Sequence, residues 1–207
     1  MKALTKTVDY STLSSMLHAQ TDKSMSILLY LGSFNPIHNG HLQIAETALH
    51  MSGNDEVWFV VSPQNPFKQN EDLLPEKLRL QMVSESIGII ENFQCCDIEF
   101  NLPRPSFTID TLRALFEKYP QHKFSLLLGS DNLLGFERWK ETTEIQRHCK
   151  IYIYPRIGYE NRGEEGGNFE MLETTLLDIS ATQIRELKKA GMPFGHMVPE
   201  PVLRLWC

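Results

Sequence analysis

The chain has 207 residues, of which 42% are hydrophobic and 22% are charged, a composition typical of a globular domain rather than of a disordered or fibrous chain. Its 20 Lys and Arg residues against 26 Asp and Glu residues give a net charge of −6, so it is a poor candidate for gripping nucleic acid by its phosphates. No apolar run approaches the roughly 20 residues of a membrane helix, and no continuous apolar segment precedes residue 24, so we expect a cytoplasmic protein without a membrane or nucleic-acid partner.

Apolar segments separated by polar ones divide the chain into predicted elements. Residues 1–24 are polar and carry only a faint helical pattern, so they are set apart as an extension of unknown role from a single domain over 25–207. In chain order the sequence then predicts a strand over 26–32, a helix over 41–51, a strand over 56–61, a helix over 75–90, a strand over 93–100, a loop and helix over 104–119, a strand over 123–129, a polar turn at 130–132, a helical stretch over 139–147, a strand over 150–155, a charged Gly-rich loop over 156–168, a short strand over 169–173 and a helix over 178–191.

Apolar strands that alternate with helices indicate a parallel sheet covered on both faces. The expected fold class is therefore α/β, a Rossmann-like, doubly wound and mostly parallel sheet with helices on both faces. Ligands bind at the carboxyl ends of the strands in such sheets. We expect the polar turns after the first and fourth strands to be the walls of the site.

The four cysteines support the expected location. Cys95 and Cys96 are adjacent, and Cys149 and Cys207 stand alone, so no CxxC pair is available for zinc or redox chemistry. We expect structural thiols in a reducing compartment, with Cys95 and Cys96 on opposite faces of their strand.

The segment GSFNPIHNGH, between the first strand and the first helix, is the strongest functional signal. His38 and His41 are three residues apart where the helix begins, so both imidazoles lie on one side, over the helix N-terminus. That end presents unpaired N–H groups and a partial positive charge, which favour phosphate, and imidazoles can donate hydrogen bonds to phosphoryl oxygens. Gly32 is expected to let the chain bend as it leaves the strand, and Gly40 to leave room for a triphosphate.

Other interpretations of the two histidines are weaker. As zinc ligands they lack an HExxH arrangement and a nearby third ligand, so no metal site is predicted. Solvated or capping histidines without a function remain an alternative from the spacing alone. Neither a P-loop nor a GxGxxG motif occurs, so phosphate would be bound by a different motif.

A second motif, ISATQIR, opens the last predicted helix with Ser180 as N-cap and Gly191 as its stop. Ser180 and Thr182 can present hydroxyl groups to an anion, and Arg185 lies one turn further on the same side. Taken alone, the segment predicts only a capped helix with an exposed arginine.

Together the two motifs resemble the signatures HxGH and ISSTxxR of the nucleotidylyltransferase superfamily. Within it, the segments SPQNPFK, PSFTIDTL and GSDNLLGFERWKE make residues 25–190 resemble the nicotinate-nucleotide adenylyltransferases. Two departures are visible: Leu31 stands where many relatives have the first glycine of a pair, and Ala181 replaces the second serine of ISST.

The resemblance implies roles for residues that would otherwise be read as ordinary loop, turn or helix-surface positions. It implies catalytic roles for His38, His41, Lys68 and Arg185. It implies ATP-binding roles for Gly32, Ser33, Phe34, His38, Gly40, His41, Ser180, Thr182 and Arg185. It implies contacts to the second substrate from Gln64, Asn65, Thr108, Asp131 and Trp139, with the Trp139 ring stacked on a flat pyridine.

The resemblance also implies a reaction: AMP passes from ATP to nicotinate mononucleotide, giving deamido-NAD and pyrophosphate, with Mg²⁺ accompanying ATP. Two kinds of alternative stay open. One is the same transfer to nicotinamide mononucleotide or pantetheine phosphate; the other is a non-catalytic nucleotide-binding module. The sequence does not indicate an oligomeric state.

Overall fold

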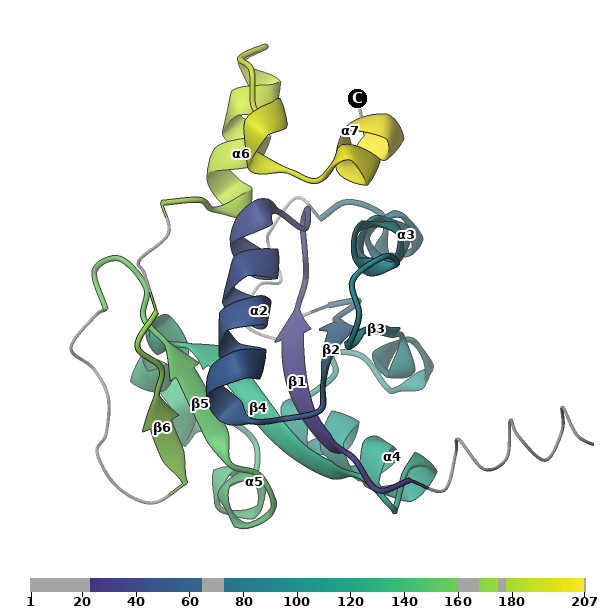
Figure 1. Ribbon diagram of the computed structural model, residues 1–207, viewed down its shortest axis with the longest axis vertical. Helices are drawn as coiled ribbons and strands as arrows, with labels where there is room; N and C mark the ends of the chain where they lie inside the picture. The colour runs from purple at the N-terminus through teal and green to yellow at the C-terminus, as the bar shows by residue number, and fades with distance from the viewer. Residues whose placement is uncertain (1–22, 65–72, 160–167, 175–177, 207) are drawn as a thin grey trace, which may run out of the picture.

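A single parallel sheet forms the centre of the protein in the computed structural model, which describes residues 23–64, 73–159, 168–174 and 178–206 (Figure 1). Among these residues the sheet has six strands, in the order β3-β2-β1-β4-β5-β6. The strands are β1 (Ser26–Gly32), β2 (Glu56–Val61), β3 (Phe93–Cys96), β4 (Lys123–Gly129), β5 (Ile151–Tyr154) and β6 (Phe169–Met171). Because the strand order reverses between β1 and β4, the predicted doubly wound fold is confirmed.

The central strands are mostly apolar because both faces of the sheet are covered. Along β1, Leu28 and Tyr30 face one core, whereas Ile27 and Leu29 face the other. Leu28 lies opposite Val57 of β2, and Tyr30 lies opposite Leu127 of β4, so the same core runs across neighbouring strands. This register fixes which side chains reach the carboxyl edge of the sheet.

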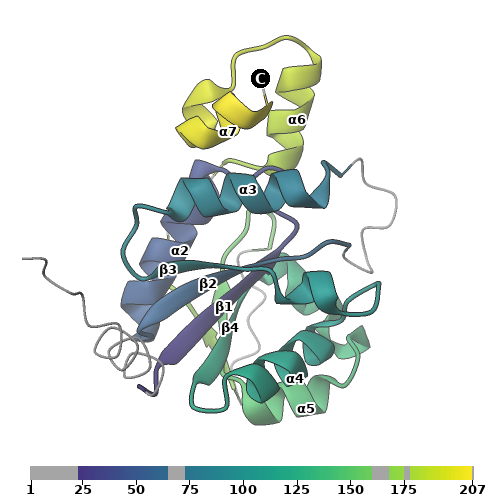
Figure 2. The same ribbon diagram turned by 90° about the vertical axis from the view of Figure 1, so that its right-hand side faces the viewer.

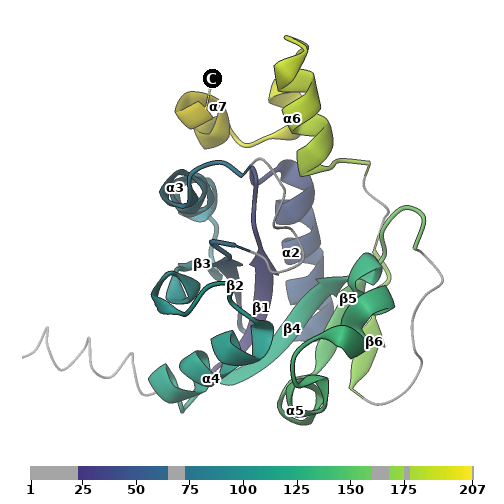
Figure 3. The same ribbon diagram turned by 180° about the vertical axis from the view of Figure 1, so that it is seen from behind.

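Two pairs of helices cover the sheet. Helices α2 (Asn39–Ser52) and α3 (Glu76–Ile87) bury side chains in the core that holds Leu28. Helices α4 (Thr108–Lys118) and α5 (Thr142–His148) pack into the opposite core. Figure 2 shows α3 on one side of the strands and α4 and α5 on the other, and Figure 3 shows the same layers from behind. No helix of the described residues is long and apolar enough to cross a membrane.

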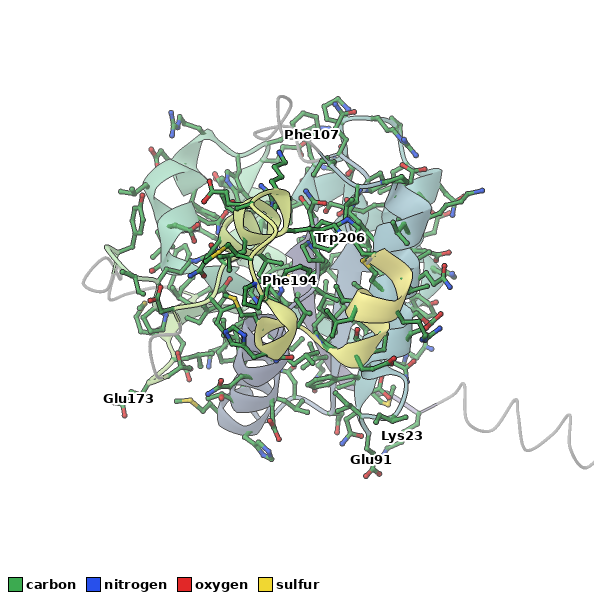
Figure 4. All side chains as sticks on the ribbon, turned by 90° about the horizontal axis from the view of Figure 1, so that it is seen from above. Lys23, Glu91, Phe107, Glu173, Phe194 and Trp206 are labelled. Carbon is green, nitrogen blue, oxygen red and sulfur yellow. The ribbon has the colours of Figure 1, made fainter. Side chains whose placement is uncertain are left out.

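Helices α6 (Ala181–Lys189) and α7 (Glu200–Trp206) lie beyond the carboxyl ends of the strands, above α2 and α3 in Figure 1. Helix α7 packs against α3, and the ring centroids of Phe194, in the segment before α7, and Trp206, in α7, lie 5.9 Å apart. Figure 4 labels both residues near the two C-terminal helices. The C-terminal segment therefore closes the end of the sheet at which ligands bind in this fold. The sequence predicts α6 but gives no prediction for α7.

Several predicted boundaries are wrong. The third strand ends at Cys96, and a 3-10 helix (Ile98–Asn101) follows, because the Glu99 side chain turns inward to accept hydrogen bonds instead of continuing the strand. The turn predicted at 130–132 begins a longer 3-10 helix (Ser130–Arg138) that buries Phe136. Helix α3 ends at Ile87 rather than at residue 90.

The prediction that Cys95 and Cys96 face opposite sides of the sheet is confirmed. Cys95 packs toward the core of α2 and α3, Cys96 packs toward the opposite core, and both are free thiols, as is the buried Cys149. Burial raises the pKa of Cys95 to about 12 and that of Cys149 to about 12, so neither is a reactive thiolate at neutral pH. Cys207 lies outside the described residues.

Candidate active site

The N-terminus of α2 is closed by two histidines that cap each other. His38 is the N-cap residue, in an extended conformation, and its Nδ1 accepts the backbone N–H of His41 at 3.3 Å. The Nδ1 of His41 in turn accepts the backbone N–H of His38 at 3.2 Å. The two rings stack with their centroids 3.6 Å apart. This is the geometry of a capping box, built here from imidazoles instead of a hydroxyl and a carboxylate.

This capping has a chemical consequence. Because each Nδ1 accepts a hydrogen bond, the proton of each neutral ring lies on Nε2, on the side turned away from the backbone. His38 is only 3% exposed, and its burial, helped by the charge of Arg156, lowers its pKa to about 3. His38 is therefore a neutral hydrogen-bond donor at physiological pH.

Two further residues, Phe34 and Gly40, shape the backbone around the histidines. The left-handed backbone conformation falls on Phe34, with φ of 45°, so the bend comes two residues later than the one predicted at Gly32. A Cβ at Gly40 would lie 3.0 Å from Nδ1 of His38 and 3.5 Å from Ile179. A side chain at residue 40 would therefore crowd the His38 imidazole, whereas Ile179 would be in ordinary van der Waals contact.

A second helix N-terminus meets the first. Ser180 is the N-cap of α6, as predicted, and its Oγ accepts the backbone N–H of Gln183 at 3.2 Å. Arg185 donates from Nη1 to the carbonyl of Asn35 at 2.9 Å and from Nη2 to Oγ1 of Thr182 at 3.2 Å. The fold thus brings the two motifs together although they are far apart in the sequence.

We call the space between these two N-termini the histidine cavity. It has a volume of about 190 Å³. It collects eight of the nine residues predicted to bind ATP, all but Gly40: Gly32, Ser33, Phe34, His38, His41, Ser180, Thr182 and Arg185. Two helix N-termini and a guanidinium aimed at one cavity favour a polyanionic ligand.

A second cavity, the aromatic cavity, of about 300 Å³, lies beside the first. Its walls include Thr108, Asp131 and Trp139, three of the predicted contacts to the second substrate. Thr108 is the first residue of α4, whose N-terminus has no side-chain cap and so leaves backbone N–H groups for an anionic ligand. Trp139 is half-buried against Phe136, with ring centroids 5.2 Å apart.

The loop that shapes the aromatic cavity is fixed by Glu99, which the sequence analysis missed. Its carboxylate accepts hydrogen bonds from Oγ of Ser106 at 2.6 Å and from Oγ1 of Thr111 at 2.8 Å. Burial raises the pKa of Glu99, while these hydroxyl donors and that of Ser62 oppose the rise. The contacts hold the segment before α4 in place, so Glu99 supports the wall that carries Thr108.

The two cavities meet at Asp131, which lines both. Its carboxylate lies 3.4 Å from Nη1 of Arg156, a cation in the histidine cavity that the sequence analysis also missed. Beneath them the hydroxyl groups of Tyr30 and Tyr154 lie 3.3 Å apart. Arg156 follows the fifth strand directly, so its place at a carboxyl end was a signal available in the sequence.

Besides Gly40, three predicted residues are not placed in either cavity. Gln64 is half-buried and does not line the histidine or the aromatic cavity. Asn65 and Lys68 lie outside the described residues. The described residues hold no group of three His, Cys, Asp or Glu side chains able to bind a metal ion.

Known proteins resemble this chain over most of its length. The family model described as cytidylyltransferase-like matches residues 29–187. A protein of Cytophaga hutchinsonii named "Probable nicotinate-nucleotide adenylyltransferase" is 47% identical over 182 residues, which cover 87% of this chain and 95% of that protein. A protein of the same name from Bacteroides fragilis is 44% identical over 177 residues, covering 85% of this chain and 88% of its own.

A solved structure supports the fold. It is that of Plasmodium falciparum nicotinic acid mononucleotide adenylyltransferase complexed with APC, which superposes with a TM-score of 0.70. The match covers 87% of this chain and 95% of the other at 18% sequence identity. It is a likeness of fold.

Proposed function

The chain belongs to the cytidylyltransferase-like family and, within it, to the nicotinate-nucleotide adenylyltransferases, and from this premise we propose how its residues transfer AMP from ATP to nicotinate mononucleotide. The single observation that carries the proposal is the pair of mutually capped imidazoles at a helix N-terminus, facing a second helix N-terminus with its arginine. These groups suit the triphosphate of ATP.

The reaction needs no covalent enzyme intermediate. A phosphate oxygen of nicotinate mononucleotide forms a bond to the α-phosphorus of ATP while the bond from that phosphorus to the bridging oxygen breaks, and pyrophosphate leaves with the electron pair. No proton has to move in this step. The work of the protein is therefore to align the two substrates and to stabilise negative charge.

We assign the triphosphate to the histidine cavity. There the Nε2–H of His41 stabilises the α-phosphoryl oxygens, and that of His38 orients the β- and γ-phosphates. Arg185 and Lys68 share the charge that grows on pyrophosphate, and Arg156 adds a cation on the opposite wall. The role of Gly40 at the triphosphate stays a prediction; it contacts His38 but does not itself line the histidine cavity.

We assign nicotinate mononucleotide to the aromatic cavity. The pyridine carboxylate faces the uncapped N-terminus of α4 at Thr108, the Trp139 ring stacks on the pyridine, and Asp131 holds the ribose. This arrangement brings the acceptor phosphate toward the junction at Asp131, next to the α-phosphate. Gln64 and Asn65 remain predicted partners of the carboxylate that nothing here places at this cavity.

Mg²⁺ belongs to the proposal as the companion of ATP. Mg²⁺ is commonly held by one or two carboxylates, water and substrate phosphates, and Asp131 is the carboxylate that lines the histidine cavity among the described residues. When bound, the ion would neutralise charge on the phosphates. A cytoplasmic location is also part of the proposal, supported by the free thiols of Cys95, Cys96 and Cys149.

A pyrophosphate-release assay tests the function directly. The enzyme is given ATP and Mg²⁺ with nicotinate mononucleotide, nicotinamide mononucleotide or pantetheine phosphate in parallel. We expect nicotinate mononucleotide to give the highest kcat/KM, because the α4 N-terminus favours an anion over a neutral amide. Preference for another acceptor would contradict the substrate assignment, and binding of an ATP analogue without any pyrophosphate release would favour a non-catalytic module.

A further inference from the structure

Arg79, on the first turns of α3, is a buried cation that neither motif includes. It is 1% exposed, and among the described residues its guanidinium donates to four backbone carbonyls. Nε donates to Leu74 at 3.0 Å, and Nη2 donates to Pro63 at 2.9 Å. Nη1 donates to Ser33 at 2.5 Å and to Ser62 at 2.8 Å.

These four carbonyls come from three separate stretches of chain. Ser33 belongs to the loop that follows β1 and carries the histidine motif. Ser62 and Pro63 follow the end of β2, and Leu74 lies just before α3. One planar guanidinium therefore ties together the chain segments that leave the carboxyl ends of β1 and β2.

The contacts continue from Arg79 to the histidine cavity. The backbone N–H of Leu74, whose carbonyl binds Arg79, donates to Oδ1 of Asn35 at 2.9 Å. The carbonyl of the same Asn35 accepts Nη1 of Arg185 at 2.9 Å. An uninterrupted path of residues thus runs from Arg79 through Leu74 and Asn35 to the arginine of the second motif.

Burying the Arg79 charge costs free energy, which suggests that Arg79 is needed for the hydrogen bonds it makes. No ion pair joins Arg79 to a carboxylate among the residues described, and burial lowers its pKa, an effect partly offset by the nearby charge of Glu76. A buried charge of this kind is generally not a net source of stability compared with an apolar side chain. What an apolar side chain could not do is satisfy four carbonyls at once.

We propose that Arg79 is a positioning residue for the triphosphate, acting through the path from Leu74 and Asn35 to Arg185; the assignment rests on the adenylyl transfer proposed above. Arg79 fixes the position of the loop at Ser33 and, through Leu74, that of the Asn35 carbonyl. The Asn35 carbonyl in turn orients the Arg185 guanidinium. Arg79 does not itself touch substrate. Its loss should therefore act on ATP more than on the acceptor, since Ser33, Asn35 and Arg185 all line the histidine cavity. Of the four residues whose carbonyls bind Arg79, Ser62 alone lines the aromatic cavity.

The test is a double-mutant cycle on steady-state kinetics. Arg79→Lys keeps the charge but cannot reproduce the planar four-carbonyl contact, and we expect it to raise the KM for ATP about tenfold while the KM for nicotinate mononucleotide changes less than about twofold. In an Arg185→Ala background the same substitution should raise the KM for ATP less than about threefold, because the residue through which Arg79 acts is already absent. Arg204→Met, which removes a surface partner of Glu85 on the same α3, is the matched control and should leave both KM values unchanged.

Three outcomes would overturn the proposal. One is an unchanged KM for ATP in Arg79→Lys; the second is an equal rise in both KM values, which indicates a general structural role; the third is a full tenfold effect in both backgrounds. If Arg79→Lys does not fold, Asn35→Ala cuts the path at its middle and should give the same selective rise. Turnover of the wild-type enzyme with ATP and nicotinate mononucleotide tests the proposed function separately, so an unchanged KM for ATP in Arg79→Lys would reject only the role of Arg79.

Discussion

The histidine cavity and the aromatic cavity share Asp131 but are built in different ways. The functional groups of the histidine cavity are oriented mainly by short-range contacts: His38 and His41 cap each other over three residues, and Ser180 and Thr182 bond within α6 or its first turn. The aromatic cavity depends on packing between distant segments, with Glu99 holding Ser106 and Thr111 and a 3-10 helix bringing Trp139 to the opposite wall.

This contrast between the two cavities shows which parts of a site a short sequence motif can describe. A short motif can encode local hydrogen bonding, so the orientation of two imidazoles follows from a few neighbouring residues. A binding wall made from loops needs buried groups far away in the sequence, such as Glu99, and these carry no recognisable motif. Substitutions in the histidine cavity should therefore act on rate, ATP binding and helix capping, whereas those in the aromatic cavity should act on acceptor binding.

The largest effect is expected for His41→Ala, which removes a hydrogen bond made to the α-phosphoryl group in the transition state. We expect kcat to fall more than about a hundredfold, or ~2.7 kcal/mol, with little change in ATP affinity. His50→Ala, at the other end of α2, is the control and should keep the wild-type rate.

His41→Gln separates chemistry from capping. Gln at this position can still reach back to the backbone N–H of residue 38, so we expect wild-type stability in urea but a rate at least about tenfold below wild type. A Gln variant with the full rate would show that the imidazole serves only as a cap.

The second effect concerns His38 and pH. Its folded-state pKa of about 3 lies below the unfolded value of 6.5, so its neutral form stabilises the fold above pH 6.5, and this contribution is lost as the pH falls toward 3. His38→Asn keeps an N-cap side chain but does not titrate. The difference in unfolding free energy between wild type and this variant should shrink by about 2 kcal/mol from pH 8 to pH 5 in urea titrations. A constant difference, or an NMR signal of His38 that titrates near pH 6.5, would contradict the buried neutral ring.

The third effect tests the aromatic cavity. Trp139→Ala should raise the KM for nicotinate mononucleotide about tenfold, corresponding to a stacking contribution near 1.4 kcal/mol, while the KM for ATP stays within about twofold. Trp139→Phe should restore part of the affinity because it retains an aromatic face. Equal changes in the two KM values would contradict the assignment of the two substrates to different cavities.

The smallest effect is expected at the start of α6. Ser180→Ala removes the cap on Gln183 and should cost about 1 kcal/mol of stability. Ser180→Asp retains a cap but places a negative charge beside the triphosphate, so its stability should stay near wild type while the KM for ATP rises. An Asp variant that binds ATP as well as wild type would move the triphosphate away from this helix.

Much of the fold could be predicted from the sequence because apolar strands and amphipathic helices have distinct periods. β1, β2 and β4 were predicted with the bounds observed, and the alternation of strands and helices indicated the parallel sheet. The third strand was predicted too long because Phe100 and Ile98 continue an apolar pattern that Glu99 interrupts only through its tertiary hydrogen bonds. Helix α7 was missed because its seven residues are too few to show a period.

The residues of the site that belong to short motifs were predicted, whereas those that act through tertiary contacts were not. His38, His41, Ser180 and Arg185 were found from motif spacing, and the fold brings them to one cavity. Sequence reasoning did not foresee that the two imidazoles bond to each other's backbone, because nothing in the spacing shows which ring nitrogen faces the chain. Arg156 was missed although it follows a predicted strand, whereas Glu99 and Arg79 were missed because they act through contacts that exist only in the folded chain.

The central claim is that the triphosphate lies between the N-termini of α2 and α6. A crystal structure with a nonhydrolysable ATP analogue tests it most directly. We expect phosphate oxygens within about 3.2 Å of Nε2 of His41 and of the Arg185 guanidinium, with the α-phosphate turned toward Asp131. A triphosphate bound at any other place on the molecule, with both histidines uncontacted, would contradict it.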